Sequence, residues 1–246
     1  MIALITGGSR GIGAETARLC AAHGYAVAVN YRADQTAASA VVAGIQSRGG
    51  RAIAVQADVS VEADVVRLFQ TIDAQLGRLT ALVNNAGILE RQTRVEHVDA
   101  ARITRIFATN VTGSFVCSRE AVKRMSLRYG GRGGAIVNVS SRAAQLGAPG
   151  EYVDYAASKA ALDALTVGLA KEVAREGIRV NGVRAGIIDT EIHASGGEPG
   201  RVSRLGPEQP LGRGGDAIEV ARAIVWLLSD EASYTTASFI DVAGGR

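Results

Sequence analysis

Apolar residues recur along the chain in short runs that are separated by longer stretches with helical spacing. The short runs, which are typical of strands, are residues 2–6, 26–30, 52–56, 81–85, 135–140, 178–183 and 238–242. Between them, stretches such as 63–76 and 217–228 place apolar residues three or four positions apart, which predicts amphipathic helices. The pattern therefore predicts seven strands that alternate with helices.

Nearly every residue of these strands is apolar, as expected when helices cover both faces of a parallel sheet. Right-handed crossovers then leave few topologies. We predict an α/β fold, a single Rossmann-type doubly wound sheet of seven parallel strands with helices on both faces. An eight-stranded (β/α) barrel is the alternative at this length, but it needs one more strand, and a glycine-rich turn follows the first strand.

The length and the connections predict one domain over residues 1–246. The one long irregular segment, residues 193–215, lies between the sixth strand and the last helix. Loops of this length in compact domains are usually functional. We expect a substrate lid at about 190–215.

Composition narrows the class of protein. The formal net charge is only +3, with basic and acidic residues interspersed, so no nucleic-acid partner is expected. Cys20 and Cys117 form no disulfide framework and no metal-ligand pattern, so we expect a reducing compartment and no metal. Because the sequence shows neither a signal peptide nor a membrane span, we expect a cytoplasmic protein that binds no membrane.

The first predicted strand is followed by TGGSRGIG, residues 6–13, which opens a helix. Glycines let the backbone turn sharply and approach a diphosphate, while the helix N-terminus favours an anion. We select Gly7, Gly11 and Gly13, with Ser9, Arg10 and Ile12 between them. The spacing differs from the GxGxxG fingerprint, so by itself it is weak evidence for dinucleotide binding. The alternative is that these glycines only form a tight strand-to-helix turn.

Two tyrosines precede a lysine in EYVDYAASK, residues 151–159. Tyr155 and Lys159 are four residues apart, on one face of a helix, whereas Tyr152 lies about 10 Å from Lys159 along the axis. The lysine therefore selects Tyr155. A nearby ammonium favours the phenolate, which would lower the phenol pKa and suit Tyr155 to general acid and base catalysis.

Ser140 and Ser141 end the fifth predicted strand, at the edge where open α/β sheets bind ligands. A serine there can donate a hydrogen bond to a substrate oxygen on which negative charge develops. Neighbouring strand residues point to opposite faces, so only one of the two is expected to act. We favour Ser141.

The end of the second predicted strand bears on cofactor choice. It reads Asn-Tyr-Arg, with no acid to hold a ribose hydroxyl, and Tyr31 and Arg32 are followed by Asp34. Guanidinium groups of Arg32 and Arg10 can bind a 2′-phosphate, so NADP(H) is favoured and NAD(H) is the runner-up. Alternatives are that Asp34 accepts from the ribose or caps the next helix, and that Arg32 is a solvated surface charge.

Together these motifs resemble the short-chain dehydrogenase/reductase family over essentially the whole chain. The resemblance includes TGxxxGxG, NNAG at 84–87, Asn110, the Ser-Tyr-Lys set and a glycine-ended C-terminus. It is strongest for bacterial glucose-dehydrogenase-like or 3-oxoacyl-carrier-protein-reductase-like oxidoreductases.

The resemblance implies a catalytic set of Asn110, Ser141, Tyr155 and Lys159, in which Asn110 joins a proton relay and Lys159 holds the nicotinamide ribose. Without it, Asn110 reads as a helix kink and Asp58 as a helix cap. Ser141 precedes Tyr155 by fourteen residues, one more than is usual, and Ala185-Gly186 replaces Pro-Gly, which should loosen the backbone there. The cofactor-binding set is Gly7, Ser9, Arg10, Gly11, Ile12, Gly13, Tyr31, Arg32, Asp58, Val59, Asn85 (with its neighbour Asn84), Ala86, Gly87, Tyr155, Lys159, Gly186, Ile188 and Thr190.

The expected function is an NADP(H)-dependent oxidoreductase that interconverts a small-molecule carbonyl and an alcohol. Alternatives are an NAD-linked alcohol or sugar dehydrogenase and a non-catalytic dinucleotide sensor. By resemblance the protein is a homotetramer. In the lid, His193 is interpreted as an ordinary loop histidine, and Arg201 and Arg204 either as anion contacts or as solvated charges.

Overall fold

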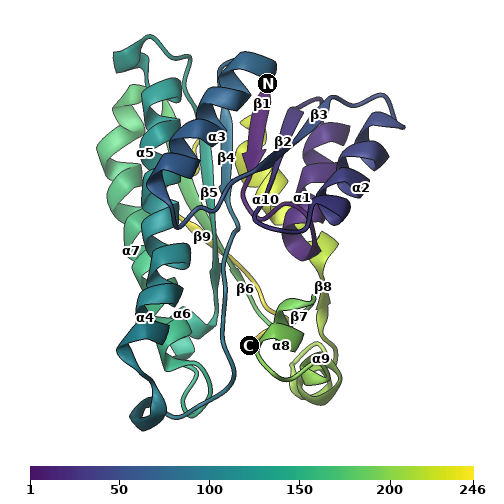
Figure 1. Cartoon of the computed structure of the whole chain (residues 1–246). Helices are drawn as coiled ribbons and strands as arrows, with labels where there is room; N and C mark the ends of the chain where they lie inside the picture. The colour runs from purple at the N-terminus through teal and green to yellow at the C-terminus, as the bar shows by residue number, and fades with distance from the viewer.

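A parallel seven-stranded sheet forms the centre of the computed structural model, which describes residues 1–246 (Figure 1). The strand order β3-β2-β1-β4-β5-β6-β9 is that of a doubly wound fold, which confirms the predicted class. The strands are β1 (Ile2–Ile5), β2 (Ala26–Tyr31), β3 (Ala52–Gln56), β4 (Ala81–Asn84), β5 (Gly134–Ser141), β6 (Ile178–Ala185) and β9 (Phe239–Val242).

Helices cover both faces of this sheet because its strands bury side chains in both directions. In β1, Ala3 and Ile5 belong to the core on one face, whereas Leu4 belongs to the core on the other. The first face carries α1 (Gly11–Ala22), α2 (Gln35–Gln46) and α10 (Ala217–Leu228); the second carries α3 (Glu62–Gln75), α4 (Ala100–Phe107), α5 (Gly113–Met125) and α7 (Val153–Val173) (Figure 1). No helix combines the length and apolar character needed to cross a bilayer.

The helical region that carries Asn110 is interrupted. After α4, residues Ala108–Thr112 form one π-helical turn before α5 begins at Gly113. A Cβ atom on Gly113 would lie 2.8 Å from the carbonyl oxygen of Val59, so only glycine allows this close approach to the segment after β3. Such π turns occur often at functional sites, and this one carries Asn110.

The expected lid at about 190–215, most of it expected to be irregular, contains the short helices α8 (Ile192–Ser195) and α9 (Arg201–Leu205). At its two ends, β7 (Ile188–Asp189) and β8 (Gly215–Asp216) form a two-stranded parallel pair. We call residues 190–215 the lid segment. Figure 1 shows α8 and α9 beyond the carboxyl ends of the strands, on the same side as the short helix α6 (Ala143–Leu146).

The two cysteines are both free and buried, Cys20 on one side of the sheet and Cys117 on the other. Burial raises the pKa of each thiol to about 12. The thiols are therefore protonated at neutral pH and act as small apolar core groups.

Candidate active site

A cavity of about 420 Å³ lies at the carboxyl ends of the strands. Its walls come from the turn after β1, the ends of β2, β4, β5 and β6, the first half of α7, and the lid segment. Every residue of the predicted cofactor-binding set lines it except Gly13 and Asn84, the neighbour of Asn85. Of the predicted catalytic set, Ser141, Tyr155 and Lys159 line it, whereas Asn110 does not.

The glycine-rich turn is shaped by backbone conformations that other residues rarely adopt. Gly7 has φ +59° and Gly11 has φ +51°, both in the left-handed region. Gly13 has another role: a Cβ atom there would lie 2.3 Å from the Gly7 carbonyl oxygen. Gly13 therefore lets α1 pack against the turn and does not itself line the cavity, and its place among the cofactor contacts stays a prediction.

Side chains from β1 and β4 hold this turn in place. Asn85 donates hydrogen bonds from Nδ2 to the carbonyl oxygens of Thr6 (2.9 Å) and Gly7 (3.0 Å). In return, the Thr6 hydroxyl oxygen accepts from the backbone N–H groups of Asn85 and Ala86, each at 3.0 Å. The NNAG segment thus holds the glycine turn in place, and the side-chain N–H groups of Asn85 provide the hydrogen bonds that do so.

The end of the cavity near β2 carries unpaired positive charge. Arg10 and Arg32 line the cavity, are exposed, and form no ion pair. Asp34 instead caps α2, because its Oδ1 accepts from the backbone N–H of Ala37 at 2.9 Å. The interpretation of Asp34 as a helix cap is confirmed.

Asp58, which also lines the cavity, does not cap α3 as its residue type suggests. Its Oδ1 accepts from the Ser60 backbone N–H (2.9 Å) and hydroxyl (2.6 Å), and closes a turn before that helix. This turn places Val59 against the cavity.

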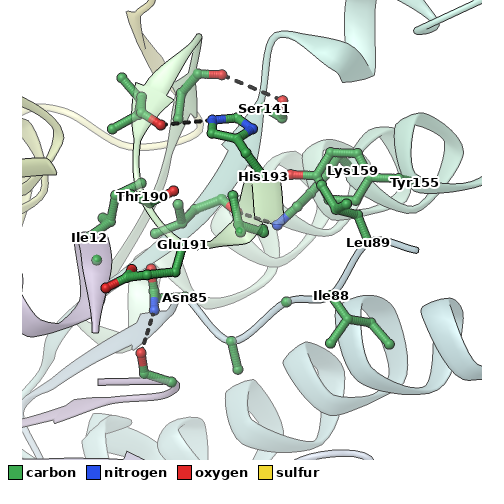
Figure 2. Close-up of a pocket in the computed structure, with 18 of the residues that line it drawn as sticks. Ile12, Asn85, Ile88, Leu89, Ser141, Tyr155, Lys159, Thr190, Glu191 and His193 are labelled. Carbon is green, nitrogen blue, oxygen red and sulfur yellow. Dashed lines mark hydrogen bonds between the residues drawn. The ribbon is translucent and has the colours of Figure 1, made fainter. Parts of the chain in front are cut away.

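Tyr155 and Lys159 lie next to each other on the first turns of α7 (Figure 2). The Lys159 ammonium nitrogen is 5.6 Å from the centroid of the Tyr155 ring, and it donates a hydrogen bond to the Val139 carbonyl oxygen at 2.7 Å. Gly87 faces this ammonium, since a Cβ atom on Gly87 would lie 3.4 Å from Nζ. The i, i+4 relation therefore brings phenol and ammonium to one wall of the cavity.

The pKa of Tyr155 shifts in the direction opposite to the one expected from its lysine neighbour. Burial raises the pKa of the phenol to about 12, and the neighbouring Ser141 hydroxyl opposes that rise. Burial also lowers the pKa of Lys159 to about 8, against the attraction of Asp163. Desolvation therefore sets the direction of the shift at both groups.

The structure separates the two candidate serines. The Ser140 hydroxyl is buried and donates to the Lys159 carbonyl oxygen at 3.3 Å, so it ties β5 to α7. The Ser141 hydroxyl lines the cavity near the Tyr155 phenol, donates to the Ala185 carbonyl oxygen at 3.4 Å and accepts from the Ala143 N–H at 3.1 Å. Of the two serines, only Ser141 has its hydroxyl beside the phenol. The one additional residue between Ser141 and Tyr155, compared with the usual family spacing, does not prevent this.

Asn110 is buried behind the cavity wall. Its side chain accepts from the Ile88 N–H at 2.8 Å and donates to the Ile88 carbonyl oxygen at 2.9 Å and to the Ser158 hydroxyl at 3.0 Å. It forms no hydrogen bond with Lys159. Asn110 therefore joins three parts of the structure: the π turn, the segment after β4, and helix α7.

Ala185, which stands where proline is usual, is held firmly. It pairs with Ser141 of β5 on one side and with Val242 of β9 on the other. Its carbonyl oxygen also accepts from the Arg142 N–H at 3.0 Å. The ladder thus restrains this backbone without a proline ring, and the expected loosening stays a prediction.

A buried ion pair at the start of α7 was not predicted. Arg102 of α4 contacts both carboxylate oxygens of Asp154, at 2.6 and 3.3 Å, and both side chains are buried. Asp154 Oδ1 also accepts from the Tyr155 N–H at 2.9 Å. Arg102 therefore fixes the first turn of α7, and with it Tyr155; nothing in a sequence marks a pair separated by 52 positions.

Tyr152 contacts the lid segment and not Lys159. Its hydroxyl donates to the Gly196 carbonyl oxygen at 3.3 Å, and its ring lies under the Arg201 guanidinium, 5.3 Å from the centroid. Arg201 is buried and pairs with Glu151 and Glu198. Neither predicted alternative holds for Arg201, which has no free charge for an anion and is not solvated.

Arg204 is exposed and pairs with Glu198, which also accepts from the Gln92 side chain at 2.6 Å. These contacts join the lid segment to the chain that follows β4. The lid arginines thus serve to fasten the lid segment.

The part of the cavity next to Tyr155 and Ser141 was not recognised from the sequence, because it is mostly apolar and lacks a motif. Its lining includes Leu89, Leu146, Ala148 and Ile192. His193, expected to be an ordinary loop residue, is 9% exposed and also lines it.

Comparison with known proteins agrees with this geometry. A family model described as "Enoyl-(Acyl carrier protein) reductase" matches residues 7–246. An uncharacterized oxidoreductase, YgfF, of Escherichia coli (strain K12) is 63% identical over 245 residues, covering 100% of this chain and 99% of the relative. A 3-oxoacyl-[acyl-carrier-protein] reductase of Synechocystis sp. is 40% identical over 250 residues, covering 99% and 96%.

Among solved structures, a short-chain type dehydrogenase/reductase from Mycobacterium marinum superposes with a TM-score of 0.92 at 34% identity, covering 99% of this chain and 94% of that one. The chain therefore belongs to the short-chain dehydrogenase/reductase family, in the branch that includes the 3-oxoacyl-carrier-protein reductases. It is an oxidoreductase of the kind that acts on CH–OH groups with a nicotinamide dinucleotide.

Proposed function

We propose that the protein catalyses the NADP(H)-dependent reduction of a ketone or aldehyde to an alcohol, and the reverse oxidation, with Tyr155 as general acid and base. The observation that carries the proposal is that Tyr155, Lys159 and Ser141 line the same cavity as the glycine turn. The residues fit a dinucleotide, since Gly7 and Gly11 adopt left-handed conformations at the N-terminus of α1. When bound, the nicotinamide supplies or accepts the hydride.

Tyr155 holds the proton that a carbonyl oxygen needs on reduction. Because burial raises its pKa to about 12, the phenol stays protonated at neutral pH and is in the form that donates this proton. Ser141, whose hydroxyl lines the same cavity, donates to the same substrate oxygen as negative charge develops there. Lys159 binds the nicotinamide ribose and, as a cation, favours loss of the phenolic proton.

Two features support NADP(H) over NAD(H). Arg10 and Arg32 offer guanidinium groups that no carboxylate in the protein neutralises, which suits a 2′-phosphate. Asp34, the competing ribose acceptor, already uses one oxygen to cap α2. An NAD-linked alcohol or sugar dehydrogenase remains the second candidate, and a dinucleotide sensor without catalysis is disfavoured by the complete Ser-Tyr-Lys set.

The lid segment, in this proposal, closes over the substrate, and the protein works as a cytoplasmic homotetramer. Exposed apolar side chains support assembly: Ile103 on α4, Phe115 on α5 and Val153 on α7, together with Trp226 on α10 and Tyr234 after it. Light scattering should give the mass of a tetramer of 25.5 kDa chains.

The function is tested by following the absorbance of NADPH and NADH with the purified protein and a carbonyl panel that includes 3-oxoacyl thioesters. We expect turnover with NADPH, and a KM for NADPH that rises at least tenfold in Arg32→Ala and Arg10→Ala while the KM for NADH changes little. Arg48→Ala, at another exposed arginine, is the matched control and should alter neither constant. Lower KM for NADH than for NADPH in the unmodified protein would reverse the cofactor assignment, and no turnover on any carbonyl would refute the activity.

A further inference from the structure

We propose that His193 determines substrate specificity: its Nδ1 accepts a hydrogen bond from a hydroxyl group of the substrate. The enzyme is therefore selective for carbonyl compounds that carry a hydroxyl close to the reacting carbon. This inference rests on the proposed function and names the substrate class for the same cavity.

The orientation of the ring assigns the roles of its two nitrogens. Nε2 lies 2.8 Å from the Ile188 carbonyl oxygen, and a carbonyl oxygen can only accept. Nε2 therefore carries the hydrogen, and in the neutral ring Nδ1 holds a lone pair. No group of the protein forms a hydrogen bond with Nδ1, although the side chain is 9% exposed.

The charge state of the ring makes Nδ1 an acceptor. Burial is the main cause of a lowered His193 pKa, and the Arg201 charge lowers it further. The Ile188 hydrogen bond and the carboxylates of Asp189 and Glu198 oppose the shift without reversing it. The ring is consequently neutral at pH 7.

The ring is also rigidly placed. His193 lies in α8, between the β7–β8 pair and Gly196, whose carbonyl oxygen is bound by Tyr152. Figure 2 shows the His193 ring on the part of the pocket wall that also carries Ser141 and Tyr155. The ring nitrogen that does not bind Ile188 has no hydrogen bond there. A fixed acceptor of this kind discriminates more strongly than one on a mobile chain.

Two lid residues offer acceptors without a partner in the protein, Glu191 and His193, but Glu191 Oε2 lies at the glycine turn, 3.6 Å from a Cβ atom placed on Gly11, which leaves His193 for the substrate. Leu89, Leu146 and Ile192 provide apolar walls. The polar lining residues nearby already have partners inside the protein, namely Arg142 with Asp241, Glu151 with Arg201, and Tyr152 with Gly196.

A substrate hydroxyl satisfies Nδ1, whereas a methyl group in its place leaves a buried lone pair without water or partner. Sites built this way reject analogues that lack the hydrogen-bond donor. Oxygens of a 3-oxoacyl thioester next to the reacting carbonyl only accept hydrogen bonds, so they do not satisfy Nδ1 either.

The test compares 2-, 3- and 4-hydroxycyclohexanone with the methylcyclohexanones of the same substitution pattern, using NADPH. We expect at least one hydroxylated isomer to exceed its methyl counterpart in kcat/KM by about tenfold or more. This is the effect expected when a buried acceptor, here Nδ1, is left without a hydrogen-bond donor. His193→Leu should reduce that ratio to near one. His193→Gln, which can donate to Ile188 and still present an oxygen acceptor, should restore a preference.

Ser195→Ala, an exposed position on the same helix, is the matched control and should leave the ratio unchanged. Calorimetric dissociation constants of the same ketone pairs with the NADP⁺-loaded protein give a readout independent of turnover, and should show the same preference and its loss in His193→Leu. Equal constants and equal kcat/KM within every pair would overturn the inference while leaving the proposed function intact. Failure of all ketones, hydroxylated or not, to react or bind would overturn both.

Discussion

Replacing Lys159 with methionine should stabilise the fold while it removes activity. The pKa of this buried ammonium falls from an ordinary 10.5 to about 8. Because each pKa unit corresponds to about 1.4 kcal/mol, the charged form costs about 3 kcal/mol of folding free energy below pH 8. Methionine keeps the length and removes the charge, but it loses the hydrogen bond to Val139, which is a loss of about 1 kcal/mol. The net expected gain at pH 7 is about 2 kcal/mol.

The pH dependence separates this cost from packing effects. Between pH 8 and 10.5 the unfolded chain binds a proton that the folded chain does not, so the stability of the unmodified protein rises with pH in this window. The advantage of Lys159→Met should therefore shrink by about 1 kcal/mol between pH 7 and pH 9. Urea unfolding of both proteins at the two pH values measures it.

Lys171→Met provides the matched control, because Lys171 is exposed on the same helix. Its effect on the free energy of unfolding should stay within about 0.5 kcal/mol at both pH values. A stability difference between Lys159→Met and the unmodified protein that is the same at pH 7 and pH 9 would refute the claim that burial lowers the lysine pKa.

Three further substitutions test the site. Tyr155→Phe should remove most turnover but leave NADPH binding, measured by fluorescence titration, nearly intact. Tyr152→Phe should keep its turnover. Loss of turnover in Tyr152→Phe and not in Tyr155→Phe would exchange the roles of the two tyrosines. Gly13→Ala should abolish dinucleotide binding and lower the melting temperature, since its Cβ would lie 2.3 Å from a carbonyl oxygen, while Gly44→Ala, with open space in α2, should stabilise by about 0.5–1 kcal/mol. Arg102→Met leaves a buried carboxylate unpaired and should destabilise by about 3–5 kcal/mol in urea unfolding; an unchanged midpoint would contradict the buried pair.

The features that the sequence predicts well depend on local spacing. The seven strands follow from short apolar runs, and the meeting of Tyr155 with Lys159 follows from the helical repeat. The glycine turn was recognisable because left-handed conformations and close contacts leave few other residue types. These properties need no knowledge of distant parts of the chain.

The features that were missed depend on contacts between distant segments. The π turn before α5 is tied to the fit of Gly113 against Val59, 54 positions away by their numbers. The direction of the Tyr155 pKa is set by burial, which the packing of the lid segment and α7 creates. His193 likewise looked ordinary, because only the fold shows that one ring nitrogen is bound to Ile188 and the other is not.

The charged contacts of the lid segment are of two kinds. Glu198 binds Arg201 and Arg204 within the segment itself, whereas Arg201 to Glu151 and Arg213 to Glu219 of α10 cross to the body of the protein. A movement of the segment away from the cavity would break these crossing pairs, together with the Gln92–Glu198 and Tyr152–Gly196 hydrogen bonds, and keep the internal ones. In the proposed closure the segment would therefore swing as one preassembled flap, and the rate of product escape would depend on how long these crossing contacts stay formed.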